Sequence, residues 1–297
     1  MENADINKSM ELSHALKVHP CFSRGNASNY GRIHLPVSSH CNIQCKFCKR
    51  VYNDSENRPG VTKEILSPKD TIKKVKKALE LCPQITVVGI AGPGDSLATP
   101  QAIETFKLIH RAYPTLIKCL STNGLLLYKY AQEIYDVGVR TITVTVNAVD
   151  PCIGSKIISY INYKGGKYYS KEASSILINN QLKGISKISK LGVIVKVNSV
   201  LIPGINDQHI GAIAKTVKDA GAFLYNIIPL IPQHEFSHIL APTCQQLNEA
   251  RITAEKYISV FKNCKHCRAD ACGIPGKKDF SNELYEITSY PETFSHG

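Results

Sequence analysis

The 297-residue sequence has no apolar run that approaches the ~18 residues of a membrane-spanning helix. Its first residues, MENADINKSMELSH, are polar and acidic and lack the basic-then-apolar order of a signal peptide. No stretch rich in proline, glycine or serine marks a linker, and there is no internal repeat. These absences predict a cytoplasmic protein that does not bind a membrane and is built on one large core, or at most two smaller ones.

Acidic residues are few beside basic ones, with 24 Asp and Glu against 36 Lys and Arg and a net charge of +12. Such a charge often indicates nucleic-acid binding. Here the basic residues are spread along the chain, without a basic tract or an interleaved aromatic ladder, so we expect no nucleic-acid partner. Two explanations stay open: a solvated lysine-rich surface, or a basic rim around an anionic group such as a thiolate-ligated iron–sulfur cluster.

Short runs rich in β-branched residues alternate with amphipathic helical patterns. The sequence Ser67-Pro68-Lys69-Asp70 offers a helix N-cap, a first-turn proline and a capping-box acid. Alternating strands and helices imply a parallel sheet, and six units are too few to close an eight-stranded barrel. We therefore predict an α/β fold, a partial (βα)6 TIM-like barrel. The predicted strands cover residues 31–38, 85–90, 115–122, 140–147, 192–200 and 223–231, and helical patterns begin near residues 67, 99, 125, 172 and 246.

The chain has eleven cysteines, and a reducing compartment would keep their thiols from forming disulfides. Most of them are grouped in a way that indicates metal or iron–sulfur ligation. One group is Cys41, Cys45 and Cys48, and another is Cys264, Cys267 and Cys272. The isolated residues Cys82, Cys152 and Cys244 are expected to be small buried hydrophobes.

The first group, in SHCNIQCKFCKR, follows the first predicted strand and has no fourth cysteine nearby. A structural zinc site normally has four ligands, so zinc would need a distant fourth ligand. Three thiolates can instead hold three irons of a cubane and leave the fourth iron open. Parallel α/β folds place their sites at this carboxyl end of the strands.

The CxxxCxxC spacing on the first strand of an incomplete barrel resembles the radical S-adenosylmethionine (SAM) superfamily. The resemblance implies a [4Fe-4S] cluster whose open iron chelates SAM, and one-electron cleavage to a 5′-deoxyadenosyl radical. The superfamily has a glycine-rich segment after the second strand, which AGPGDSLATP matches, although such a turn is also an ordinary loop. Polar residues at strand ends suit cofactor binding or simple helix capping. The implied cofactor-binding residues are Gly92, Pro93, Gly94, Asp95, Ser121, Thr122, Asn123, Thr145, Asn147 and Asn198.

Longer motifs extend the resemblance from about residue 19 to residue 276. They are HPCF, GRIHLPVSSHCNIQCKFC, NRPGV, AGPGDSLA, LSTNGL, TVNAVDP, KVNSVLIPGIND and CRADACG. These motifs are similar to those of the NifB family of nitrogenase cofactor biosynthesis proteins. The resemblance implies an enzyme that fuses two [4Fe-4S] substrate clusters and inserts a SAM-derived carbide, giving an eight-iron precursor for nitrogen fixation.

The family pattern also implies ligands for the substrate clusters. Cys21, His34 and Cys119 match the ligands of one, although His34 alone is equally a strand histidine with an ordinary hydrogen bond. Cys264 and Cys267 match the ligands of the other, with a redox pair or half a zinc site as alternatives, and Cys272 is a third ligand or a spare thiol. Glu56 is the implied proton carrier or else a solvated loop acid, and the preceding loop has no cysteine.

The resemblance implies an organisation in three parts. Residues 1–30 form an N-terminal extension with a cluster ligand, residues 31–262 the barrel, and residues 263–297 a cysteine-bearing tail expected to fold back over the open end of the sheet. We expect a monomer without a NifX-like domain, whose partners are cluster donor and carrier proteins and an electron donor such as a ferredoxin. Two other functions stay open: a radical SAM enzyme that modifies a peptide or small molecule with auxiliary clusters, and a non-catalytic iron–sulfur scaffold or carrier.

Overall fold

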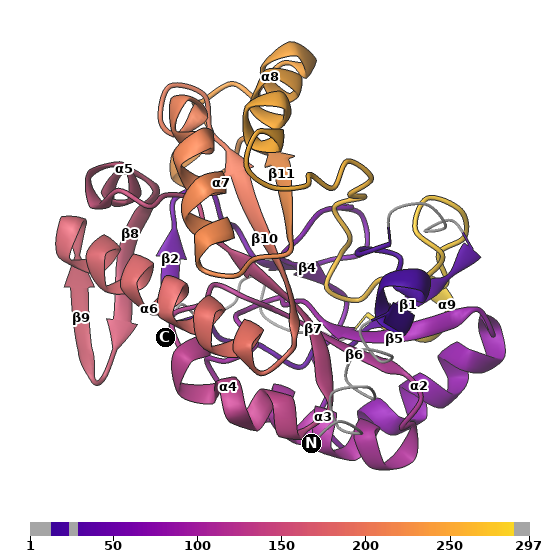
Figure 1. The fold of residues 1–297 in the computed structure, drawn as a ribbon. Coiled ribbons are helices and arrows are strands. Elements are labelled where there is room, and N and C mark those ends of the chain that lie inside the picture. Colours follow the sequence, from indigo (N-terminus) through magenta and orange to yellow (C-terminus); the bar gives the residue numbers. More distant parts are fainter. Residues whose placement is uncertain (1–12, 24–28, 288–297) are drawn as a thin grey trace.

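The main sheet is a curled, open half-barrel of six parallel strands with one antiparallel strand added (Figure 1). The computed structural model describes residues 13–23 and 29–287. The strand order is β11-β10-β7-β6-β5-β1-β12. The six parallel strands are β1 (Gly31–His34), β5 (Ile85–Ile90), β6 (Ile117–Thr122), β7 (Val139–Thr145), β10 (Ile194–Leu201) and β11 (Leu224–Pro229). They match the six predicted runs, so the prediction of a partial barrel is confirmed.

Helices cover the outer face of this sheet and bury their apolar sides against it. In α3, for example, Ile103, Phe106 and Ile109 follow helical spacing and are buried in the main core. The helices are α2 (Asp70–Leu81), α3 (Gln101–Ala112), α4 (Leu127–Asp136), α6 (Ser170–Lys190), α7 (Ile210–Asp219) and α8 (Cys244–Glu255). No helix in the described part of the chain has the length and apolar character needed to cross a membrane.

A small antiparallel sheet, which the sequence reading missed, lies beside the barrel. It joins β2 (Ile43–Cys45) to the hairpin of β8 (Ile158–Tyr163) and β9 (Gly166–Tyr169), which follows the short helix α5 (Pro151–Ile157). Lys164 and Gly165, at the hairpin turn, both have positive φ, as a two-residue turn of this kind requires. Ile158 and Ile161 are buried at a spacing of three, so the period of two that reveals a strand is absent.

The C-terminal tail adds a strand to the β1 edge of the sheet. Its strand β12 (Cys272–Gly273) pairs antiparallel with β1, with Gly273 opposite Arg32 and Cys272 opposite Ile33. Figure 1 shows this segment, coloured yellow, and the short helix α9 (Ser281–Leu284) beside β1. The tail therefore pairs with an edge of the sheet, rather than only covering its open end as expected.

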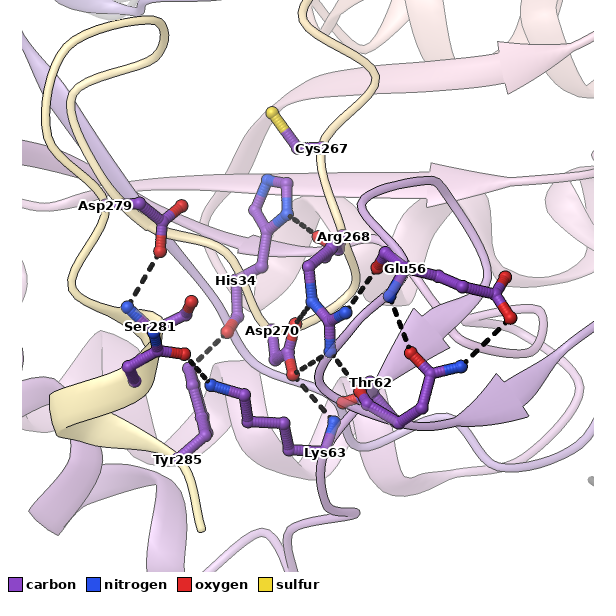
Figure 2. A network of polar contacts seen from close by, with 12 residues as sticks. His34, Glu56, Thr62, Lys63, Cys267, Arg268, Asp270, Asp279, Ser281 and Tyr285 are labelled. Carbon is purple, nitrogen blue, oxygen red and sulfur yellow. Dashed lines mark hydrogen bonds and ion pairs between the residues drawn. The ribbon is translucent and has the colours of Figure 1, made fainter. Parts of the chain in front are cut away.

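A buried polar network fastens the tail to the loop that carries β3 (Val51–Tyr52) and β4 (Val61–Thr62) (Figure 2). The fully buried Asp270 carboxylate accepts hydrogen bonds from Arg268 Nε at 2.8 Å and from the Lys63 backbone N–H at 2.7 Å. Arg268 also donates to the backbone carbonyls of Asn53 and Glu56. Each buried charge thus has partners, as burial requires.

The isolated cysteines do not all behave as predicted. Cys82 is buried, but Cys152 and Cys244 are exposed, so the expectation of burial is wrong for these two. Each lies in the first turn of a surface helix whose inward face is formed by other residues, such as Gly154 and Ile157 in α5.

Replacing Asp270 with Asn removes the negative charge and keeps the size of the side chain. Arg268 would then be buried without a counter-charge, so the free energy of unfolding should fall by about 3 kcal/mol or more. Chemical denaturation measures this change. The control, Glu133→Gln, breaks an exposed 3.3 Å pair with Lys107 and should cost less than about 1 kcal/mol. Equal losses in the two variants would contradict the importance given to the network.

Candidate active site

The cysteine triad lies in the loop after β1, and a buried glutamine fixes the shape of that loop. Cys45 ends β2, and the Cys48 N–H donates to the Cys45 carbonyl at 3.0 Å. The Gln44 side-chain amide donates to the carbonyls of Cys45 at 2.9 Å and Cys48 at 3.4 Å. The loop therefore has a defined conformation that presents three half-buried thiols: Cys41, Cys45 and Cys48.

These thiols lie in surroundings that resist their ionisation. Burial raises the pKa of Cys41 to about 11 and also raises the pKa values of Cys45 and Cys48. The positive charge of the buried Arg50 acts in the opposite direction on all three. A bound metal centre displaces such protons, since metal ligation needs the thiolate. Within residues 13–23 and 29–287, no three His, Cys, Asp or Glu side chains lie close enough to hold a single metal ion.

The glycine-rich segment after β5 packs directly on the triad loop. The Gly94 N–H donates to the Ser38 carbonyl at 2.6 Å, and the Asp95 N–H donates to the His40 carbonyl at 2.8 Å. A Cβ atom at Gly94 would lie only 2.0 Å from the His40 carbonyl oxygen, so this close approach requires glycine. The segment thus supports the triad loop through its backbone.

Asp95 and Asn123 connect the ends of neighbouring strands. The buried Asp95 carboxylate accepts from the Thr122 hydroxyl at 2.9 Å and from the Asn123 N–H at 2.6 Å. Burial raises the pKa of Asp95, and these hydrogen bonds act to lower it. The Asn123 side-chain amide donates to Asn42 Oδ1 at 2.7 Å and reaches Cys41 Sγ at 3.8 Å. The residue that follows the carboxyl end of β6 therefore contacts the triad directly.

Gln181 is a site residue that the sequence reading did not find. From α6, its side-chain amide donates to the carbonyls of Asn123 and Thr145, each at 2.8 Å. A glutamine on the buried face of an amphipathic helix was the available signal, because buried polar groups are expected to have hydrogen-bond partners.

The triad borders a cavity of about 270 Å³ at the carboxyl ends of the strands. Eight of the predicted cofactor-binding residues line it, namely Pro93, Gly94, Asp95, Ser121, Thr122, Asn123, Thr145 and Asn147. Gly92 and Asn198 do not line it, and Asn198 Oδ1 instead accepts a hydrogen bond from the Asn226 side-chain amide at 3.1 Å. Glu56 is also outside the lining, where its half-exposed carboxylate pairs with Arg58 Nε at 2.5 Å.

His34 belongs to a second group of side chains inside the barrel. Its Nδ1 lies 3.0 Å from the Arg268 carbonyl, which can only accept, so Nδ1 carries the proton and Nε2 keeps its lone pair. Burial lowers the pKa of His34 to about 4, so the imidazole is neutral at pH 7. Histidines that bind metals commonly donate their other N–H to a carbonyl in this way.

Three cysteines accompany His34. Burial raises the pKa of Cys21 to about 12, and the nearby thiols of Cys267 and Cys119 raise it further. Lys196 and Arg32 oppose this shift in pKa, and Arg32 donates to Cys267 Sγ at 3.0 Å. The structure therefore brings together residues from the N-terminal segment, β1, β6, β10 and the tail. We call His34, Cys21, Cys119 and Cys267 the His34 group.

The other two tail cysteines lie differently. Cys264 is half-buried in the tail three residues before Cys267. Cys272 is fully buried in the main core and pairs with Ile33, so it shares the face of Ile33 and not that of His34. This placement favours the interpretation of Cys272 as a spare core thiol.

Comparisons with known proteins agree with this arrangement. The sequence model of the radical SAM superfamily matches residues 35–217. The FeMo cofactor biosynthesis protein NifB of Methanocaldococcus infernus is 47% identical over 95% of this chain and 93% of its own length. The NifB protein of Methanocaldococcus jannaschii is 46% identical over 95% of this chain and 94% of its own length. That of Azotobacter vinelandii is 39% identical over 87% of this chain but only 53% of its own length.

Solved structures share the fold at low sequence identity. Streptococcus suis SuiB superposes with a TM-score of 0.58 at 12% identity, over 88% of this chain and 54% of that one. A radical SAM methyltransferase from Sphaerobacter thermophilus gives a TM-score of 0.54 at 16% identity, over 78% of this chain and 64% of that one. With the half-barrel, the triad loop and these relatives in agreement, the chain belongs to the radical SAM superfamily and, within it, to the NifB family.

Proposed function

We propose that this chain is a radical SAM enzyme of FeMo cofactor biosynthesis that fuses two [4Fe-4S] substrate clusters and inserts a carbide derived from SAM. The observation that supports this proposal is the presence of two donor groups in one barrel. The triad borders a cavity, and the His34 group combines a neutral imidazole with three thiols. A radical enzyme without auxiliary clusters needs only the first.

The superfamily uses SAM and a [4Fe-4S] cluster, and the residues around the triad suit both. Cys41, Cys45 and Cys48 would hold the cluster, and the polar strand ends in the cavity would contact SAM. Together these cofactors supply one-electron cleavage of a C–S bond. Gln44 and Asn123 orient the triad, and Arg50 offers positive charge beside the thiols.

Within the His34 group, His34, Cys21 and Cys119 are suited to holding the first substrate cluster. His34 presents Nε2 as a neutral ligand, and Cys21 and Cys119 supply thiolates. Neutral imidazole adds no negative charge and is displaced more easily than thiolate. Such ligation suits a cluster that must be changed and then released.

Cys264 and Cys267 are the proposed ligands of the second substrate cluster. Arg32 donates to Cys267 Sγ at 3.0 Å, so a positive charge lies beside this proposed ligand. Because two ligands hold a cluster incompletely, this cluster is free to move toward the first. Glu56 is proposed as the proton carrier, and its pair with Arg58 keeps the carboxylate outside the cavity lining.

Two other functions explain less of the structure. A peptide- or small-molecule-modifying enzyme leaves the free Nε2 of His34 without a role. A non-catalytic scaffold has no use for the cavity beside the triad. The proposed reaction also requires proteins that donate clusters, a carrier that accepts the product and a ferredoxin-like electron donor, and we propose that the chain acts as a monomer.

The fully loaded chain should bind about twelve irons, the sum of three four-iron clusters. Replacing all three triad cysteines with Ala should remove about a third of them, because the other two clusters have separate ligands. Iron and sulfide analysis after anaerobic reconstitution measures both values. A ceiling of about four irons in the unsubstituted chain would exclude this function and favour a simpler radical enzyme.

Replacing His34 with Ala should alter the electronic spectrum of one substrate cluster, because it removes an imidazole ligand. Reductive SAM cleavage should remain largely intact, since it depends on the triad. A suitable control is His209→Ala, because His209 Nε2 accepts a structural hydrogen bond from the Val149 N–H at 3.1 Å. If the two variants gave the same spectrum as the unsubstituted chain, His34 would be a structural residue.

Carbide insertion uses one SAM as methyl donor and another for hydrogen abstraction. Turnover should therefore release both S-adenosylhomocysteine and 5′-deoxyadenosine, and a labelled methyl carbon should finish inside the iron–sulfur product. Joint replacement of Cys21 and His34 should prevent fusion while 5′-deoxyadenosine still forms. Formation of 5′-deoxyadenosine without S-adenosylhomocysteine or cluster-bound label would show that the carbide mechanism is wrong.

A further inference from the structure

The barrel holds a second buried histidine, whose tautomer is the opposite of that of His34. His19 is only 2% exposed, and its Nδ1 accepts a hydrogen bond from the Cys21 backbone N–H at 3.0 Å. Because Nδ1 carries the lone pair, the neutral ring has its proton on Nε2. His34 thus presents a lone pair, whereas His19 presents an N–H.

The Nε2–H of His19 has no hydrogen-bond partner among the described residues. The ring lies within electrostatic range of His34 and Lys196 and packs edge-on against Phe22, with ring centroids 4.6 Å apart. A buried donor without an acceptor is unfavourable, because the N–H group has lost its hydrogen bond to water. The orphaned N–H beside the His34 group therefore points to an acceptor that residues 13–23 and 29–287 do not provide.

Lys196 is a buried cation with no carboxylate partner in the described residues. It is 5% exposed, and its ammonium donates to the Cys21 carbonyl at 3.2 Å. It also lies over the rings of Phe22 and Phe261, at 4.7 and 5.2 Å from their centroids. The ammonium has three N–H groups, and the structure gives it one carbonyl acceptor and two ring faces. No carboxylate among the described residues balances its buried positive charge.

Arg32 adds a third donor to the same surroundings. The buried guanidinium donates to the Gly273 carbonyl at 2.8 Å and to Cys267 Sγ at 3.0 Å, and its Nε–H has no partner among the described residues. His19, Arg32 and Lys196 thus place more N–H donors around Cys21 and Cys267 than the described residues have acceptors for them.

We propose that His19, Arg32 and Lys196 form a donor set that binds the sulfide atoms of the substrate cluster held at the His34 group. This inference rests on the proposed function and assigns positioning residues to it. Inorganic sulfides are the acceptors that an anionic iron–sulfur cluster presents, and hydrogen bonds to them and nearby positive charge stabilise its reduced state. His19 is a donor and not an iron ligand, because Nδ1 already accepts from the Cys21 N–H.

The test measures the reduction potential of the cluster that depends on His34. The triad cysteines are first replaced by Ala in the full-length chain, so that the triad cluster does not contribute to the spectrum. The signal of the cluster of interest is then the part of the spectrum that a further His34→Ala substitution abolishes. Redox titration followed by electron paramagnetic resonance is then repeated with His19→Leu and Lys196→Met, which remove a donor. The matched variants His19→Gln and Lys196→Arg each keep an N–H at about the same reach.

We expect His19→Leu and Lys196→Met to shift the midpoint potential to more negative values, and the matched variants to restore most of the shift. Unchanged potentials in the Leu and Met variants would overturn the inference and leave the proposed function standing. A change of ligand pattern in both His19 variants would also overturn it, because His19 would then bind iron. Absence of any His34-dependent signal before substitution would instead overturn the proposed function, and this inference with it.

A second measurement separates binding from a merely structural role of Lys196. In the cluster-free chain, Lys196→Met replaces an uncompensated buried cation with an apolar side chain of similar length, so the melting temperature should rise. The same variant should retain less of the His34-dependent cluster after gel filtration. Opposite signs support the donor role. A fall in both quantities would make Lys196 a structural residue and overturn its part in the donor set.

Discussion

Strand β1 is hydrogen-bonded along both of its edges, and the placement of both donor groups depends on this pairing. On one side it pairs with β5, and on the other the tail adds β12 and accepts the His34 N–H at the Ala271 carbonyl, 2.8 Å away. The triad loop leaves the carboxyl end of β1, while the tail brings Cys267 and the Arg268 carbonyl to His34. The four residues of β1 thus hold together segments that are more than two hundred positions apart in sequence.

Desolvation is the common physical feature of the barrel interior. Burial raises the pKa of each triad thiol and of Cys21 and Cys119, and it lowers the pKa of His19 and His34. Lys196 and Arg32 are buried among these neutral groups. This combination is unfavourable, because among the described residues the Lys196 ammonium has no carboxylate partner and one N–H each of His19 and Arg32 has no acceptor. Anionic iron–sulfur clusters would supply what is missing, which gives the unfavourable interior a function.

The sequence allowed the strands and the triad loop to be predicted because both have local signals. Residues 85–90 and 194–201 are rich in β-branched residues, and Cys41, Cys45 and Cys48 lie within one loop. Strand β8 has no clear period of two, and β12 consists of only two residues, which pair with β1. The tautomer of His34 could not be predicted either, because the Arg268 carbonyl that sets it is distant in sequence and is brought to His34 by the fold.

The two donor groups occupy successive layers of one barrel. Cys119, in the His34 group, and Ser121, in the cavity lining, are two residues apart on the same face of β6. On β10, Lys196 and Val200 also share one face but lie four residues apart, with Asn198 between them. A strand rises about 3.3 Å per residue, so the layers at β6 are separated by only about 7 Å. Under the proposed function, chemistry that begins in the cavity would reach a cluster at His34 without a mobile carrier. The fixed spacing of a strand, rather than a moving domain, would then set the distance between the radical source and its target.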